Sequence, residues 1–256
     1  MVSTSGLEST ASSLENWTRA GYVARGLVYI LLGYVAMQSS SADSTSDLFK
    51  AVEDLPAGSV LLAIIMIGAF GYGLWKIFDA VKNLEGFDDD AKGKAKRFFY
   101  VVAGFGYFIM AYLAGKTLFG SGGSGQGTQE AASMAPDWLL YATGAGILIA
   151  GLYQFKKGIT KEFLAGLAGG TPPFVTYFGQ FGHFARGVVF VVSGWFVIQS
   201  TGNSDQAKGL AGALQSMRDT GAFFTILCIG LILFGIFSLI EARYRIIPNE
   251  DLRPNR

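Results

Sequence analysis

Long apolar runs separated by short polar segments dominate the pattern of this chain. Each of six runs has roughly the 17 to 25 residues that a helix needs to cross a hydrocarbon layer. The runs cover residues 20–38, 57–80, 97–119, 137–156, 177–200 and 221–241. The pattern predicts an all-α integral membrane protein with six transmembrane helices.

The chain also matches itself at a fixed offset, which is the signature of internal repetition. Residues Gly21–Gly26 read GYVARG, and residues Gly182–Gly187 read GHFARG. A second match joins Tyr72–Trp75 to Phe234–Phe237. Because one match lies in a first helix and the other in a second helix, the repeated unit is a pair of helices.

A weaker middle copy fits between these two when Lys96 is placed beneath Arg25. Three tandem two-helix repeats in a pseudo-three-fold arrangement are therefore expected. The predicted organisation is a polar N-terminal tail at 1–16, repeat 1 at 17–87, repeat 2 at 92–160, repeat 3 at 175–245 and a cytoplasmic tail at 246–256.

Composition and charge support a membrane location. Hydrophobic residues make up 51% of the 256 residues and charged residues 15%, which is too apolar for a soluble domain of this size. Sixteen of the twenty lysines and arginines fall on the side of the predicted bundle that carries both termini. The positive-inside rule then places both termini in the cytoplasm and the protein in the cell inner membrane. A net charge of +1 gives no reason to expect a nucleic-acid partner.

The predicted external linkers differ from one another. Residues 48–55 and 210–217 carry apolar side chains at helical spacing on polar segments, which predicts short helices lying on the outer membrane surface. Residues 120–127 are rich in glycine and serine instead, and we expect this linker to be mobile.

Charged residues near the ends of the helices are the main candidates for a site. Arg25 and Arg186 lie about one turn inside their predicted helices, and Asp79 and Glu241 lie at the cytoplasmic ends of the second helices. Because the two helices of a repeat are antiparallel neighbours, Arg25 is expected to meet Asp79, and Arg186 to meet Glu241. Such pairs fit a structural clamp with buried arginine stems. The alternative is a ring of charges around a cytoplasmic vestibule that binds an anion or a lipid headgroup.

The middle repeat offers lysines where the other repeats have an arginine and an acid. Lys96 and Lys157 occupy these positions without an acidic partner in the same repeat. Two unpaired cations near the axis would favour an anionic lipid or ligand.

Few other residues suggest chemistry. His183 is the single histidine and replaces Tyr22 of the first repeat, which fits a structural hydrogen bond, with pH sensing as the less favoured alternative. Cys228 is the single cysteine and lies in an apolar run. No metal cluster, phosphate loop or nucleophile motif is found, so neither a cofactor nor an enzymatic activity is expected.

The segments Gly21–Tyr29 (GYVARGLVY) and Gly235–Arg245 (GIFSLIEARYR) resemble a bacterial membrane family described as a domain of unknown function, number twelve-zero-six. The resemblance covers nearly the whole chain from Trp17 to Arg245. It implies a repeated two-helix unit, commonly in three copies. It brings no activity and no catalytic residues.

Two functions fit these observations. The first is a non-enzymatic scaffold or accessory subunit that binds membrane lipids or a membrane protein partner. The alternative is a small transporter or channel whose repeats enclose a central cavity for an anionic or amphipathic solute. No acid, histidine or lysine is predicted at the centre of a helix, which weakens the case for proton or sodium coupling. A lipid-modifying enzyme is the weakest of the possibilities considered.

Overall fold

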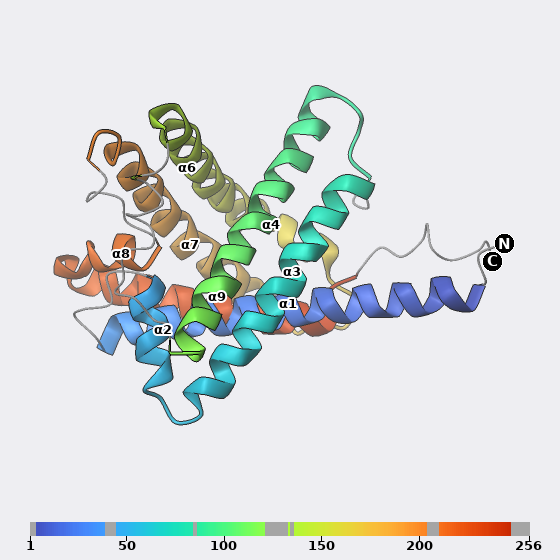
Figure 1. Ribbon diagram of the computed structural model, residues 1–256, viewed down its shortest axis with the longest axis horizontal. Coiled ribbons are helices and arrows are strands. Elements are labelled where there is room, and N and C mark those ends of the chain that lie inside the picture. The colour runs from blue at the N-terminus through green and yellow to red at the C-terminus, as the bar shows by residue number, and fades with distance from the viewer. Residues whose placement is uncertain are drawn as a thin grey trace.

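The computed structural model describes residues 4–38, 45–83, 86–120, 133, 136–203 and 210–246. Six helices are long and apolar enough to cross a membrane, which confirms the expected all-α fold. They are α1 (Thr4–Gln38), α3 (Gly58–Lys82), α4 (Ala91–Leu118), α6 (Asp137–Thr160), α7 (Phe174–Gln199) and α9 (Ala222–Tyr244) (Figure 1). The described residues form no strand beyond one isolated antiparallel bridge between Leu167 and Arg245.

The first helix is longer than its membrane span. The apolar span begins at Thr18, whereas α1 begins at Thr4. Residues expected to form a polar tail therefore continue α1, and Figure 1 shows this part of the helix projecting beyond the bundle. The predicted cytoplasmic tail lies outside the described residues apart from Ile246, and the glycine-rich linker at 120–127 does so apart from Gly120.

Two short helices cap one end of the bundle. They are α2 (Thr45–Glu53), against α1, α3 and α4, and α8 (Leu210–Gln215), against α7 and α1. Phe49 and Val52 of α2 and Leu214 of α8 are completely or almost completely buried. The expected helices are present, but these apolar side chains are not turned outward to a membrane surface. Their apolar side chains contribute to the protein core instead.

The six spanning helices pack in the order α4, α3, α1, α9, α7, α6. The closest neighbours are thus helices of different repeats. The first helix of each repeat packs against the second helix of the preceding repeat, in the three interfaces α3·α4, α6·α7 and α9·α1. Because the last of these returns to the first helix, the repeats follow one another in a cycle.

Each of these three interfaces has a glycine from both helices at its crossing point. A Cβ atom added to any of these glycines would lie 2.6–3.1 Å from the facing carbonyl oxygen, so only glycine allows the backbones to approach this closely. The glycine pairs are Gly26 with Gly235, Gly73 with Gly104, and Gly151 with Gly187. The crossings also identify equivalent residues in the three repeats, since Gly104 of the middle repeat takes the place of Gly26 and Gly187.

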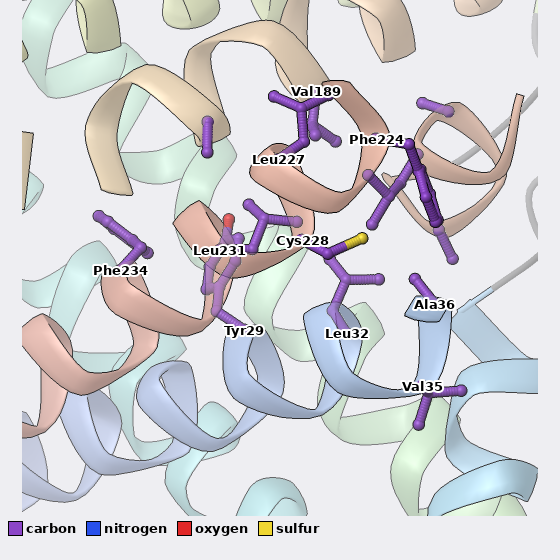
Figure 2. Packing of buried hydrophobic residues seen from close by; sticks show 14 of the residues in the cluster. Tyr29, Leu32, Val35, Ala36, Val189, Phe224, Leu227, Cys228, Leu231 and Phe234 are labelled. Atoms are coloured by element: carbon purple, nitrogen blue, oxygen red, sulfur yellow. The ribbon is translucent and has the colours of Figure 1, made fainter. Parts of the chain in front are cut away.

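The α9·α1 interface continues into the main apolar core. Figure 2 shows Tyr29 and Leu32 of α1 beside Cys228, Leu231 and Phe234 of α9. All five are buried. The first and last spanning helices therefore form the centre of the molecule.

The two helices within a repeat pack together in repeats 1 and 3 and separate in the middle repeat. In repeat 1, Gly21 fits against the ring of Tyr72, and in repeat 3 Gly182 fits against Phe234. The equivalent residue of the middle repeat is Phe99, whose ring reaches Gly146 of α6. Throughout their described lengths, α4 and α6 do not pack along each other, and Figure 1 shows them diverging.

This opening leaves a normally buried position uncovered. Ala24 and Ala185 of repeats 1 and 3 are 0% and 5% exposed, whereas the equivalent Val102 is 49% exposed. The large Phe99 side chain accounts for the difference, because it occupies the space where a glycine would let the second helix approach.

Candidate functional site

The candidate site lies at one end of the bundle, which we call the charged end. Three side chains at equivalent positions of the three repeats define it. Each donates to a carbonyl oxygen at the C-terminal end of the neighbouring spanning helix. The bonds run from Arg19 to Ala242, from Arg97 Nε to Ala80 (2.6 Å) and from Gln180 Nε2 to Gly158 (2.9 Å). Donors at this point satisfy carbonyls that have no partner within the helix.

A buried ion pair joins the first and third repeats at this end. Arg25 of α1 contacts the carboxylate of Glu241 on α9, and its Nε donates to Ser238 Oγ at 3.0 Å. The two charged side chains are 11% and 7% exposed. Arg245 Nη1 also lies 3.5 Å from Glu241 Oε1. Glu241 therefore compensates two arginines.

This arrangement overturns the expected pairing within a repeat. Arg25 does not meet Asp79, because the helix that faces it across the glycine crossing is α9 and not α3. Asp79 is buried and lies 3.6 Å from Lys76 of its own helix. The residue equivalent to Arg25 in the α3·α4 interface is the uncharged Ala103.

Arg186 is likewise placed differently from the prediction. It lies about three turns from either end of α7, near the middle of the helix rather than one turn inside it. Its Nε donates to Tyr29 Oη at 2.7 Å, and its guanidinium lies 4.5–5.2 Å from the ring centroids of Phe190, Phe234 and Tyr29. Among the described residues it forms no ion pair, with Glu241 or any other acid. Aromatic faces and one hydroxyl stabilise this cation instead.

The two lysines of the middle repeat lie in different environments. Lys157 is half-buried near the end of α6, with its ammonium 5.0 Å from the ring of Tyr153. It is within electrostatic reach of Glu241, Arg186, Arg245 and Arg25. Lys96 is exposed near the start of α4, and its ammonium lies 4.7 Å from the ring of Phe87. Lys157 therefore belongs to the charge cluster, and no contact within the described residues joins Lys96 to it.

His183 is buried beside the cluster. Its Nδ1 forms a hydrogen bond of 2.5 Å with Oε1 of Gln154, and its ring stacks on Phe163 with centroids 5.1 Å apart. The rings of Phe234 and Phe237 complete this packing. These contacts support the structural interpretation, and a pH-sensing role remains a prediction.

Outside the spans, one carboxylate has a shifted titration. Glu162, in the short helix η1 (Glu162–Gly166), accepts a hydrogen bond of 2.6 Å from Lys156 Nζ. This bond lowers the pKa of Glu162 below its ordinary value. No group of three or more histidine, cysteine or acidic side chains among the described residues could hold a metal ion.

The cluster is thus a chain of cations with few acids. Among the described residues, Arg25 and Arg245 contact the carboxylate of Glu241. Lys157 lies within electrostatic reach of Glu241 and of the three arginines Arg25, Arg186 and Arg245. Such an arrangement can attract and hold an anion.

Sequence reasoning missed three contributors to this cluster, namely Tyr29, Ser238 and Phe234. The guanidinium groups of Arg25 and Arg186 lie 5.3 and 5.0 Å from the Phe234 ring centroid. A signal was available, because Ser238 lies one helical turn before Glu241 and so presents its hydroxyl on the same face.

Comparison with known proteins gives the same repeat structure. The model of a family described as Domain of Unknown Function (DUF1206) matches residues 20–83, 98–161 and 181–245. The middle match places Ala103, and not Lys96, beneath Arg25, and it places Lys157 beneath Asp79. This corrects the alignment expected from sequence and agrees with the glycine crossings.

One curated relative matches along most of its length. It is a protein of Bacillus subtilis (strain 168) named "Uncharacterized protein YxxB", and it is 30% identical over 257 residues. The match covers 93% of this chain and 94% of the relative. No solved structure matches the chain significantly.

Proposed function

The chain belongs to the DUF1206 family of three-repeat membrane proteins, and from its structure we propose that it is a non-enzymatic scaffold or accessory subunit. In this proposal the open middle repeat receives a membrane lipid or the transmembrane helix of a protein partner. The observation that carries the proposal is the separation of α4 from α6, which leaves Val102 uncovered where its equivalents are buried.

The proposal includes a location in the cell inner membrane with both termini in the cytoplasm. The lysine and arginine distribution supports this orientation, because the charged end holds Arg19, Arg97 and Lys157. The burial of α2 and α8 at the other end is also consistent with a protein that opens sideways, between α4 and α6, rather than through its capped end.

Site-specific photocross-linking in cells tests the proposal. A photoreactive residue at Val102 should capture a defined lipid species or one protein, because this position faces the opening. The matched control is Ile67, which is an exposed apolar residue of α3. Identical labelling of bulk lipid from both positions would contradict a specific occupant.

A small transporter or channel is the second candidate function. The observation that favours it is Arg186, since a charge in the middle of a spanning helix often marks a solute pathway. Solute flux into proteoliposomes would then fall on Lys157→Ala and remain with Lys96→Ala, because only Lys157 belongs to the charge cluster. Equal flux in both variants and in empty liposomes would exclude this function.

A further inference from the structure

The three equivalent interfaces balance their charge in three different ways. The glycine crossing gives a common reference point for the three interfaces. At the same distance from it, one helix of each interface carries the residue equivalent to Arg25, and the other helix carries the residue equivalent to Glu241. In α9·α1 these positions hold Arg25 and Glu241, which form a direct pair. In α3·α4 they hold Ala103 and Asp79, and Asp79 is compensated by Lys76 of its own helix.

The α6·α7 interface alone places a cation at both positions. Arg186 stands where Arg25 stands, and Lys157 stands where Glu241 stands, relative to the crossing of Gly151 with Gly187. The residue of this interface that is equivalent to Ser238 is Gln154, and its side chain is hydrogen-bonded to His183. In the described part of the chain, neither Arg186 nor Lys157 has a carboxylate in direct contact.

Helix direction inclines these two cations toward each other, and Lys157 lies within electrostatic reach of Arg186. Side chains of a helix tilt toward its N-terminus. Since α6 and α7 are antiparallel across the glycine crossing, Arg186 tilts toward the charged end and Lys157 tilts away from it. This is the geometry by which Arg25 and Glu241 meet in the α9·α1 interface.

We propose that an anion of the phosphate type binds to Arg186 and Lys157 on the inner side of the α6·α7 interface, in place of the carboxylate that Glu241 supplies to Arg25. Arg186 Nε donates to Tyr29 Oη, so the terminal nitrogens of the guanidinium would face the anion. A phosphate oxygen matches the planar donor set of arginine, and lysine adds a second charge-assisted contact. The phosphate can come from the headgroup of an anionic phospholipid or from a dissolved phosphate ion. The headgroup source rests on the proposed function, whereas the dissolved source does not.

Thermal unfolding of the full-length protein in lipid nanodiscs tests this inference in two arms. The first arm adds inorganic phosphate to phosphatidylcholine nanodiscs, against chloride at the same ionic strength. The second arm replaces part of the phosphatidylcholine with anionic phosphatidylglycerol, without phosphate. A rise in Tm is expected in at least one arm. A rise in the first identifies a dissolved anion, and a rise in the second alone identifies a headgroup.

The decisive variant is Lys157→Glu, which gives Arg186 a carboxylate and copies the Arg25 site. It should melt at a higher temperature than the native protein when no anion is added. Its apparent affinity for the anion should fall at least about tenfold, because a charge-assisted contact is lost. Lys157→Gln should show the same loss of affinity, and it serves as the test if Lys157→Glu does not fold.

The matched control is Lys82→Glu, which makes the same charge change at an exposed position at the end of α3. It should keep the response of the native protein. No rise in Tm in either arm would overturn the inference, as would a response that survives in the Lys157 variants or disappears equally in Lys82→Glu. Specific cross-linking from Val102 without an anion response would reject this inference and retain the proposed function.

Discussion

The middle repeat and the two outer repeats are built from equivalent pairs of helices, but the pair is packed together in the outer repeats and separated in the middle one. Gly21 and Gly182 let each outer repeat close on an aromatic residue of its own second helix, whereas Phe99 stands at the equivalent position of the open middle repeat. The contacts between repeats are nevertheless conserved in geometry, since all three glycine crossings are present. One side chain can therefore open a repeat protein at a chosen point without disturbing the interfaces that hold it together.

The outer repeats should be most sensitive at the Arg25 and Glu241 pair. Glu241→Ala should lower the free energy of unfolding by roughly 3–5 kcal/mol, because it leaves a buried guanidinium without its counter-charge. The double variant Arg25→Ala with Glu241→Ala should cost less than the sum of the single changes. Denaturant titration in detergent micelles measures both effects.

A second double-mutant comparison can distinguish the pairing of Arg25 with Glu241 from its pairing with Asp79. Arg25→Ala combined with Asp79→Ala should be additive within about 0.5 kcal/mol, since these residues belong to different interfaces. A strong coupling between Arg25 and Asp79 would restore the pairing within a repeat that the sequence predicted.

The next largest difference between the repeats should come from glycine-to-alanine substitutions. Gly235→Ala places a Cβ atom 2.6 Å from the carbonyl oxygen of Gly26 and should cost roughly 1–3 kcal/mol. Gly106→Ala in the middle repeat has nothing within 4 Å of the added atom, and it should be neutral or slightly stabilising. Equal losses in thermal unfolding would mean that the middle repeat is closed.

The role of Phe99 can be measured directly. Cysteines placed at Val102 and Gly146, in a Cys228→Ala background, should form little disulfide in the native sequence. In repeat 1 the equivalent Ala24 and Gly68 are in contact. Phe99→Gly should therefore raise the cross-linked fraction several-fold, because it removes the side chain that separates the helices.

Phe98→Gly is the control for the cross-linking experiment. It introduces the same glycine at the neighbouring exposed position of α4. An equal rise in cross-linking would show that a flexible helix, and not the wedge at Phe99, controls the opening.

The smallest effect should come from the surface pair that follows the middle repeat. The lowered pKa of Glu162 means that its contact with Lys156 contributes stability above the ordinary pKa of about 4.5. The contribution is lost as the pH falls through the lower pKa of the folded protein. Glu162→Gln should remove this acid-dependent part of the Tm, and an unchanged pH profile would show that the pair contributes nothing.

Much of the fold could be predicted, because apolar length and internal repetition are properties of the sequence itself. The alignment of the middle repeat could not be read in the same way. Placing Lys96 or Ala103 beneath Arg25 changes the alignment by seven residues, which is nearly two helical turns and keeps apolar residues on the same face. The close approach of Gly73 and Gly104 distinguishes the two alignments, and that contact lies between repeats.

The charge pairing failed for a related reason. Neighbours in sequence were taken as neighbours in space, which holds for many helical hairpins. Here Arg25 faces α9, so its partner could be found only from the cyclic order of the repeats. The depth of Arg186 was underestimated in the sequence itself, because nine residues of the apolar run that begins at residue 177 already precede it. Since α7 begins at Phe174, three residues earlier still, Arg186 lies near the middle of the helix.

The cyclic order also sets a condition on biosynthesis. Arg25 enters the membrane with the first helix, but its counter-charge is carried by the last helix and is translated 216 residues later. Until that helix is inserted, the growing chain holds a cation in lipid and an unfilled apolar surface on α1. A nascent chain that stops before α9 should therefore be recognised by membrane quality-control proteases.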